Sequence, residues 1–146
     1  MALVSSLAAL LAPPIAVLWV LHTTRIGRDL GRHQSPPLSL PEVRDLLGEF
    51  AGFFENDARS DLWLHSRAPE ATIVYERHGL IYVYGPLDAA RAVLEAAGLR
   101  EGPVAIPSLH EHHYRAEYDE AERALASRYD WTITPLRAED EQIPTV

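Results

Sequence analysis

The sequence predicts an α+β protein in which one N-terminal transmembrane helix precedes a small domain with a mixed sheet of four or five strands and about three helices. Residues 2–21 carry no charged side chain, segments of helical and strand periodicity alternate after residue 38, and the absence of cysteine excludes a disulfide framework. A chain of 146 residues has room for one ordinary domain besides the apolar segment. The expected organisation is a transmembrane helix over 1–22, a basic, proline-containing linker over 23–38, the α+β domain over 39–136 and a polar tail over 137–146.

The apolar segment is long enough to cross a bilayer as a helix. Twenty residues at 1.5 Å per residue reach about 30 Å, the thickness of the hydrocarbon core. Pro13 and Pro14 interrupt the segment, but prolines are tolerated in transmembrane helices, and Trp19 lies where an interfacial anchor is expected. A cleaved signal peptide is a weaker alternative, because no Lys or Arg precedes the segment. A helix that packs into or onto the domain is another, although a helix apolar on every side has no obvious solvent face.

Positive side chains follow the apolar segment and none precedes it. Arg25, Arg28 and Arg32 all lie in the predicted linker. The positive-inside rule places such a flank in the cytoplasm. The expected localisation is therefore the inner or plasma membrane, as a single-pass protein with its N-terminus outside and its C-terminal domain in the cytoplasm.

The folded domain is expected to begin with a helix. Ser39 and Glu42 fit the S-x-x-E capping box, and Leu38 and Val43 fit the hydrophobic staple around it. Apolar residues then recur at helical spacing until the polar stretch ENDARSD, namely Val43, Leu46, Leu47, Phe50, Phe53 and Phe54. This stripe is expected to pack against the sheet of the domain.

A hairpin is expected after a short strand, DLWLH, at 61–65. Residues 71–85, ATIVYERHGLIYVYG, contain two β-rich runs that flank His78 and Gly79, the predicted two-residue loop. In that register Tyr75 pairs with Tyr82.

The same register decides which side chains of the hairpin share a face. One face would carry Tyr75, Tyr82 and Tyr84, and the other would carry Val74, Ile81 and Val83. The smaller aliphatic set is the better core, so the three tyrosines are expected to form a surface that contacts another protein.

Helices and strands are expected to alternate in the remainder of the domain. Residues 85–99 predict a helix that ends in a Schellman motif at Gly98. The stretch PVAIP at 103–107 predicts a strand, residues 108–129 predict a second long helix, and DWTITPL at 130–136 predicts a last strand. Helical crossovers after Tyr84 would be right-handed and would make part of the sheet parallel.

The sequence HEHH at 110–113 is the cluster that suggests chemistry. On the predicted helix, His110, His113 and Glu117 share one side at spacings of three and four residues, where imidazole and carboxylate groups could bind zinc. The pattern is not the H-E-x-x-H motif of metalloproteases, because Tyr114 occupies the position of the second histidine. No other cofactor is indicated, since the Walker, dinucleotide-binding and nucleophile-elbow motifs are absent.

The charge of the chain argues against nucleic acid as a partner. The whole chain carries −8, and the linker carries three arginines and one aspartate, so the residues from 39 onward carry −10. An acidic domain repels phosphate backbones, whose neutralisation by Lys and Arg supplies most of the affinity for nucleic acid.

The favoured function is that of a non-enzymatic accessory or regulatory subunit, anchored in the lipid bilayer by one helix. Its cytoplasmic domain would bind a protein partner in a membrane assembly, with affinity gained from confinement at the membrane. Two alternatives are a metal-dependent enzyme that uses His110 and His113, and an acidic inhibitor that covers a basic protein.

Overall fold

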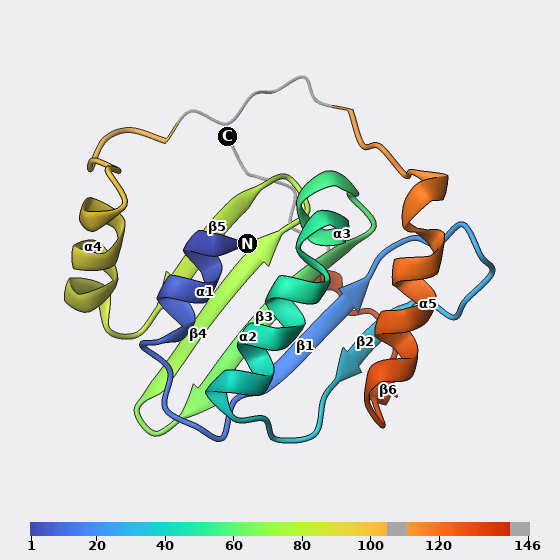
Figure 1. Ribbon diagram of the computed structural model, residues 1–146, viewed down its shortest axis with the longest axis horizontal. Coiled ribbons are helices and arrows are strands. Elements are labelled where there is room, and N and C mark those ends of the chain that lie inside the picture. The colour runs from blue at the N-terminus through green and yellow to red at the C-terminus, as the bar shows by residue number, and fades with distance from the viewer. Residues whose placement is uncertain (105–110, 141–146) are drawn as a thin grey trace.

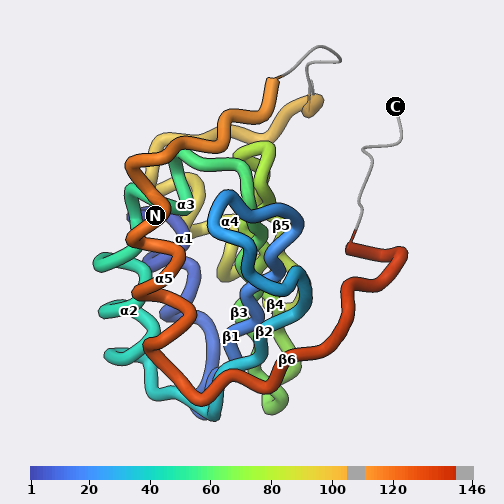
Figure 2. The backbone as a smooth tube through the Cα atoms, turned by 90° about the vertical axis from the view of Figure 1, so that its right-hand side faces the viewer, coloured from blue at the N-terminus to red at the C-terminus, as the bar shows by residue number. Residues whose placement is uncertain are grey.

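Six antiparallel strands form one sheet with the order β5-β4-β3-β1-β2-β6, and the helices cover one of its two faces (Figures 1 and 2). The computed structural model describes residues 1–104 and 111–140. The strands are β1 (Ala16–Leu21), β2 (Gly31–Gln34), β3 (Ser60–Arg67), β4 (Glu70–Glu76), β5 (Leu80–Tyr84) and β6 (Thr132–Thr134). The helices are α1 (Ala2–Ala8), α2 (Leu40–Glu49), α3 (Ala51–Asn56), α4 (Leu87–Ala96) and α5 (Asp119–Arg128), with short 3-10 turns at Ala116–Tyr118 and Ala138–Asp140.

The prediction of a transmembrane helix over residues 1–22 is wrong, because this segment forms α1 and the central strand β1. Pro13 and Pro14, which cannot donate backbone hydrogen bonds within a helix, lie between the two elements. The run AVLWVL is rich in β-branched and aromatic residues and pairs with β3 on one side and β2 on the other. Its side chains lack charge because they are buried within the protein, with Trp19 fully inaccessible to solvent.

The predicted localisation is contradicted together with the transmembrane helix. In the parts of the chain that the structure describes, no helix has both the length and the apolar character needed to cross a membrane. The predicted linker over 23–38 also contains a structural element, since β2 lies between β1 and β6 and Leu38 forms a bridge with Ile15. The N-terminal residues are therefore part of the domain.

The sheet is not the mixed sheet of four or five strands that the sequence predicts. β1 and β2 supply two additional strands, and every adjacent pair is antiparallel. Pro103 and Val104 of the predicted strand PVAIP are not in a strand, and its other residues lie outside the described residues. The predicted parallel crossovers after Tyr84 are wrong, because β6 pairs antiparallel with β2.

The helix that begins after Ser39 is confirmed, including its capping box. Ser39 Oγ accepts a hydrogen bond from the Glu42 N–H at 3.4 Å, and the Glu42 carboxylate accepts one from the Ser39 N–H at 2.8 Å. Phe50 separates α2 from α3. All members of the predicted apolar stripe are buried in the core between the helices and the sheet: Val43, Leu46, Leu47, Phe50, Phe53 and Phe54.

The β4–β5 hairpin differs from its predicted register by one residue. The loop contains three residues, 77–79, between the paired residues Glu76 and Leu80. Gly79 is the one loop residue with a positive φ, +79°, and its N–H donates to the Glu76 carbonyl at 2.8 Å, as in three-residue hairpin loops. The observed pairs are Glu76 with Leu80, Tyr75 with Ile81, Val74 with Tyr82, Ile73 with Val83 and Thr72 with Tyr84. A shift of one residue moves a side chain to the opposite face, so Tyr75 does not share a face with Tyr82 and Tyr84.

The helix over 85–99 is confirmed, and the helix over 108–129 is shorter than predicted. α4 ends in the expected Schellman motif, in which the Leu99 N–H donates to the Leu94 carbonyl at 3.0 Å and Gly98 has a positive φ. Residues 111–115 are not helical, and α5 begins only at Asp119.

A buried ionic network attaches α5 to the start of β3. The Arg59 guanidinium is inaccessible to solvent and contacts Asp57 at 2.9 Å, Glu122 at 2.6 Å and Asp119 at 2.8 Å. Burial alone would lower the pKa of Arg59, but the carboxylates, Glu122 foremost, outweigh burial and raise this pKa. The network thus holds together two segments that are far apart in the sequence.

Candidate functional site

The sheet face opposite the helices carries aromatic side chains of β3 and β5. Because side chains alternate along a strand, Tyr82 and Tyr84 of β5 lie on this open face with Trp63 of β3. Tyr84 is 55% exposed, whereas Tyr82 and Trp63 are partly buried. Figure 2 shows the helices gathered on the other side of the sheet. The open face at β5 therefore presents amphipathic rings to solvent.

The opposite end of the open face is partly covered by the chain itself. Arg32 of β2 lies over the ring of Trp63, at 5.8 Å from its centroid, and forms an ion pair with Asp140 of the C-terminal 3-10 turn. This arrangement leaves the tyrosine end of the face more open than the β2 end.

The structure brings two of the three predicted interface residues together. Tyr82 and Tyr84 share the open face, while Tyr75 lies on the helix side, where it packs against the core. Burial raises the pKa of Tyr82, and the nearby Glu76 carboxylate raises it further. Tyr82 is therefore a neutral hydrogen-bonding group at the physiological range of pH.

Two carboxylate–histidine pairs fix the turn that ends β4. Asp61 accepts a hydrogen bond from the Arg77 N–H at 2.9 Å and contacts His22 Nε2 at 2.8 Å. Glu76 accepts one from the His78 N–H at 3.0 Å and also contacts the His78 ring. Both carboxylates are buried. Asp61 holds the β4–β5 turn against the segment that contains His22, and Glu76 holds His78 within the turn itself.

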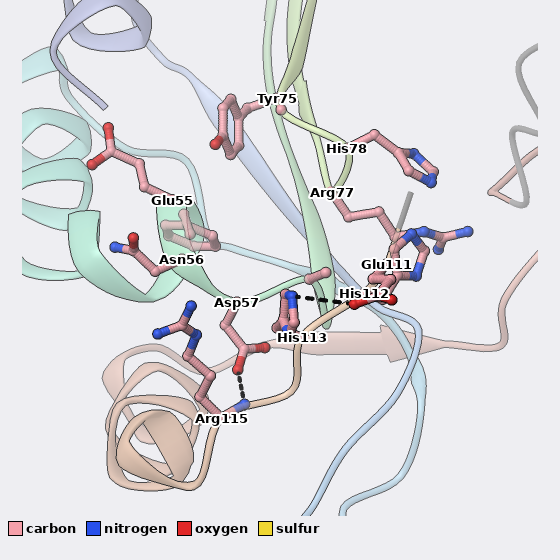
Figure 3. A pocket seen from close by; sticks show the side chains of 13 residues that line it. Glu55, Asn56, Asp57, Tyr75, Arg77, His78, Glu111, His112, His113 and Arg115 are labelled. Atoms are coloured by element: carbon pink, nitrogen blue, oxygen red, sulfur yellow. Dashed lines mark hydrogen bonds and ion pairs between the residues drawn. The ribbon is translucent and has the colours of Figure 1, made fainter. Parts of the chain in front are cut away.

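A polar pocket lies next to the β4–β5 turn (Figure 3). It has a volume of about 340 Å³ and is lined by the end of α3, the β4–β5 turn and the segment 111–115. Asp57 accepts a hydrogen bond from the Arg115 N–H at 2.7 Å, and the Ala58 N–H donates to the His113 carbonyl at 3.1 Å, which holds this segment against α3. Tyr75 and His78 also line the pocket.

The helical arrangement on which the predicted zinc site depends is not present. His113 lies in an irregular segment with its side chain 64% exposed, and Glu117 lies in the following 3-10 turn, where it pairs with Arg115 at 3.8 Å. His110 lies outside the described residues. Within residues 1–104 and 111–140, no group of three or more histidines and carboxylates could hold a metal ion.

The sequence alone does not predict the contacts that give this region its structure. His112 packs against His78 with ring centroids 4.7 Å apart, and His22 meets Asp61 across 39 residues of sequence. No local spacing signals either contact. Among the charged groups of the pocket, Asp57 is bonded to Arg59 and to the Arg115 N–H, whereas Arg77 Nε is buried without a hydrogen-bond partner in the described residues.

No protein-family model matches the chain, and no similar curated protein and no similar solved structure was found.

Proposed function

We propose that this domain is a non-enzymatic binding module that recognises a basic protein partner through the β5 end of the open sheet face. The observation that carries the proposal is the exposure of Tyr84 beside Tyr82 on a sheet face that the helices leave uncovered. Tyrosine is enriched at protein interfaces because it offers a large, rigid apolar area together with a hydrogen-bonding hydroxyl.

The charge of the chain supports a basic partner. A net charge of −8 attracts positively charged proteins and speeds their encounter, and it repels nucleic acid. The proposal concerns the domain alone, since the segment predicted as a membrane anchor is part of its fold.

Site-specific photo-crosslinking in cells of the source organism tests this function. A photoreactive amino acid replaces Tyr84, and in a matched control it replaces Glu120, which is also exposed but lies on α5. The position 84 variant is expected to form a discrete adduct with a basic protein, and the position 120 variant is expected not to form that adduct. Adducts from position 120 without any from position 84 would contradict the proposal.

A substitution in the same place provides a second test. Tyr84→Arg replaces an exposed ring with a positive charge that repels a basic partner. It is therefore expected to weaken partner capture without changing the free energy of unfolding by more than about 0.5 kcal/mol. Unchanged capture by a folded Tyr84→Arg variant would count against the open face as the binding surface.

A further inference from the structure

β5 is the edge strand at one end of the sheet, and the helix layer continues past this edge (Figure 1). α4 lies beyond this strand at one end of the helix layer (Figure 1), with Ala90 buried in the core. Leu87, 62% exposed, and Leu99, 48% exposed, remain open to solvent. A groove of about 290 Å³ separates α4 from β5, and Val83 contributes to its wall. The groove beside β5 is thus lined by apolar side chains together with Arg91, Glu95, Arg100 and Glu101. In the described part of the chain, no strand pairs with this edge of β5.

The outer edge of β5 offers backbone groups to a further strand. The bond from the Gly79 N–H to the Glu76 carbonyl closes the turn and makes Glu76 and Leu80 a hydrogen-bonded pair. Hydrogen-bonded and non-hydrogen-bonded pairs alternate in an antiparallel ladder. The N–H and C=O groups of Ile81 and Val83 therefore point away from β4 and toward the groove side of the sheet.

We infer that this edge takes an extended segment of the partner protein as a seventh strand, with apolar side chains at alternating positions and a net positive charge. The inference rests on the proposed function and adds the mode of recognition. The outward N–H and C=O groups of Ile81 and Val83 need a partner whose own C=O and N–H groups are spaced two residues apart, and only an extended backbone has that spacing. Strand addition also satisfies an edge that no strand among residues 1–104 and 111–140 pairs with.

The two faces of the added strand meet different surroundings. Residues opposite Ile81 and Val83 point to the helix side, where Leu87, Leu94 and Leu99 line or border the groove. The alternate residues point to the open face beside Tyr82 and Tyr84. A basic partner is favoured over a second copy of this chain, because two copies that each carry −8 repel one another.

Amide hydrogen exchange of the full chain with a defined peptide tests the inference. The probe is the blocked peptide KVKVKVK, whose valines can enter the groove while its lysines face outward. The amides of Ile81 and Val83 are expected to exchange at least about tenfold more slowly at saturating peptide, while the amide of Tyr82, already directed at β4, stays unchanged. No protection of these two amides at millimolar peptide would overturn the inference.

A matched peptide isolates the contribution of the backbone. The same sequence with N-methylated valines keeps every side chain and charge but loses the N–H groups that would bond to β5. It is expected to bind at least about tenfold more weakly, because the loss of two hydrogen bonds corresponds to roughly that factor. Equal binding of the two peptides would overturn strand addition.

A variant of the protein probes the same edge. Val83→Pro removes an outward N–H without removing a bond to β4, so it is expected to abolish peptide protection of Ile81 while the chain still unfolds cooperatively. Should the variant fail to fold, the peptide pair still decides the question.

Other occupants of the edge would give different results. Protection of Ile81 and Val83 in the free monomer would assign the edge to the chain itself, and protection that rises with protein concentration would assign it to a second copy. Either result overturns the inference. If a partner crosslinks from Tyr84 while the peptide leaves both amides unprotected, strand addition fails and binding at the open face stands.

Discussion

At the scale of single residues, Arg59 is the side chain whose loss should cost most. Asp57 and Glu122 are as inaccessible to solvent as Arg59, so Arg59→Leu leaves two buried carboxylates without their cation. The free energy of unfolding, measured by urea denaturation, is expected to fall by about 3–5 kcal/mol. Removal of the exposed Arg123, which pairs with Glu120 at 3.2 Å, is the control and should change it by less than about 0.5 kcal/mol. A cost below about 1 kcal/mol for Arg59→Leu would show that the network is accessible to water.

Single residues also explain which parts of the candidate site the sequence could predict. The amphipathic character of Tyr82 and Tyr84 is visible in the sequence and made them candidates for an interface. Tyr75 was grouped with them wrongly, because one glycine decides the loop length and the face of every side chain that follows. The contact of His22 with Asp61 depends on the pairing of β1 with β3, which no local pattern specifies.

At the scale of the elements, the connections at the two ends of β5 differ in what they tolerate. Gly79 has φ +79° and nothing within 4 Å of an added Cβ, so Gly79→Ala is expected to cost about 1–2 kcal/mol for the left-handed conformation. Gly85 has φ +121°, and an added Cβ would lie 2.9 Å from the Glu70 carbonyl oxygen. Gly85→Ala should therefore cost more than Gly79→Ala in urea denaturation. Equal costs would contradict the close approach of the Gly85 backbone to β4.

Elements with their own local signals were predicted well. The capping box at Ser39 and the Schellman motif at Gly98 each depend on residues within a few positions, and both are confirmed. The helix over 108–129 was predicted too long, because residues 111–115 are held against Asp57 and Ala58 by tertiary hydrogen bonds rather than by bonds within a helix.

At the scale of the whole molecule, the first 22 residues were interpreted wrongly for a physical reason. A central strand next to a buried helix produces an uncharged run as long as a transmembrane helix, and only Pro13 and Pro14 mark the division between them. The alternation of AVLWVL is weak because Val20 on the open face is as buried as Trp19 on the helix face. Charge and hydropathy alone could not separate the two cases.

β1 is an interior strand of the sheet, and both the folded domain and its open face depend on it. The most direct test compares the urea denaturation of the full chain with that of a variant that begins at Gln34. The truncation removes α1, β1 and the first three residues of β2, so β3 and β6 lose the strands that lie between them. The variant is therefore expected to show no cooperative transition, while the full chain unfolds cooperatively. A cooperative transition in the variant, with a free energy of unfolding close to that of the full chain, would show that the domain folds without β1.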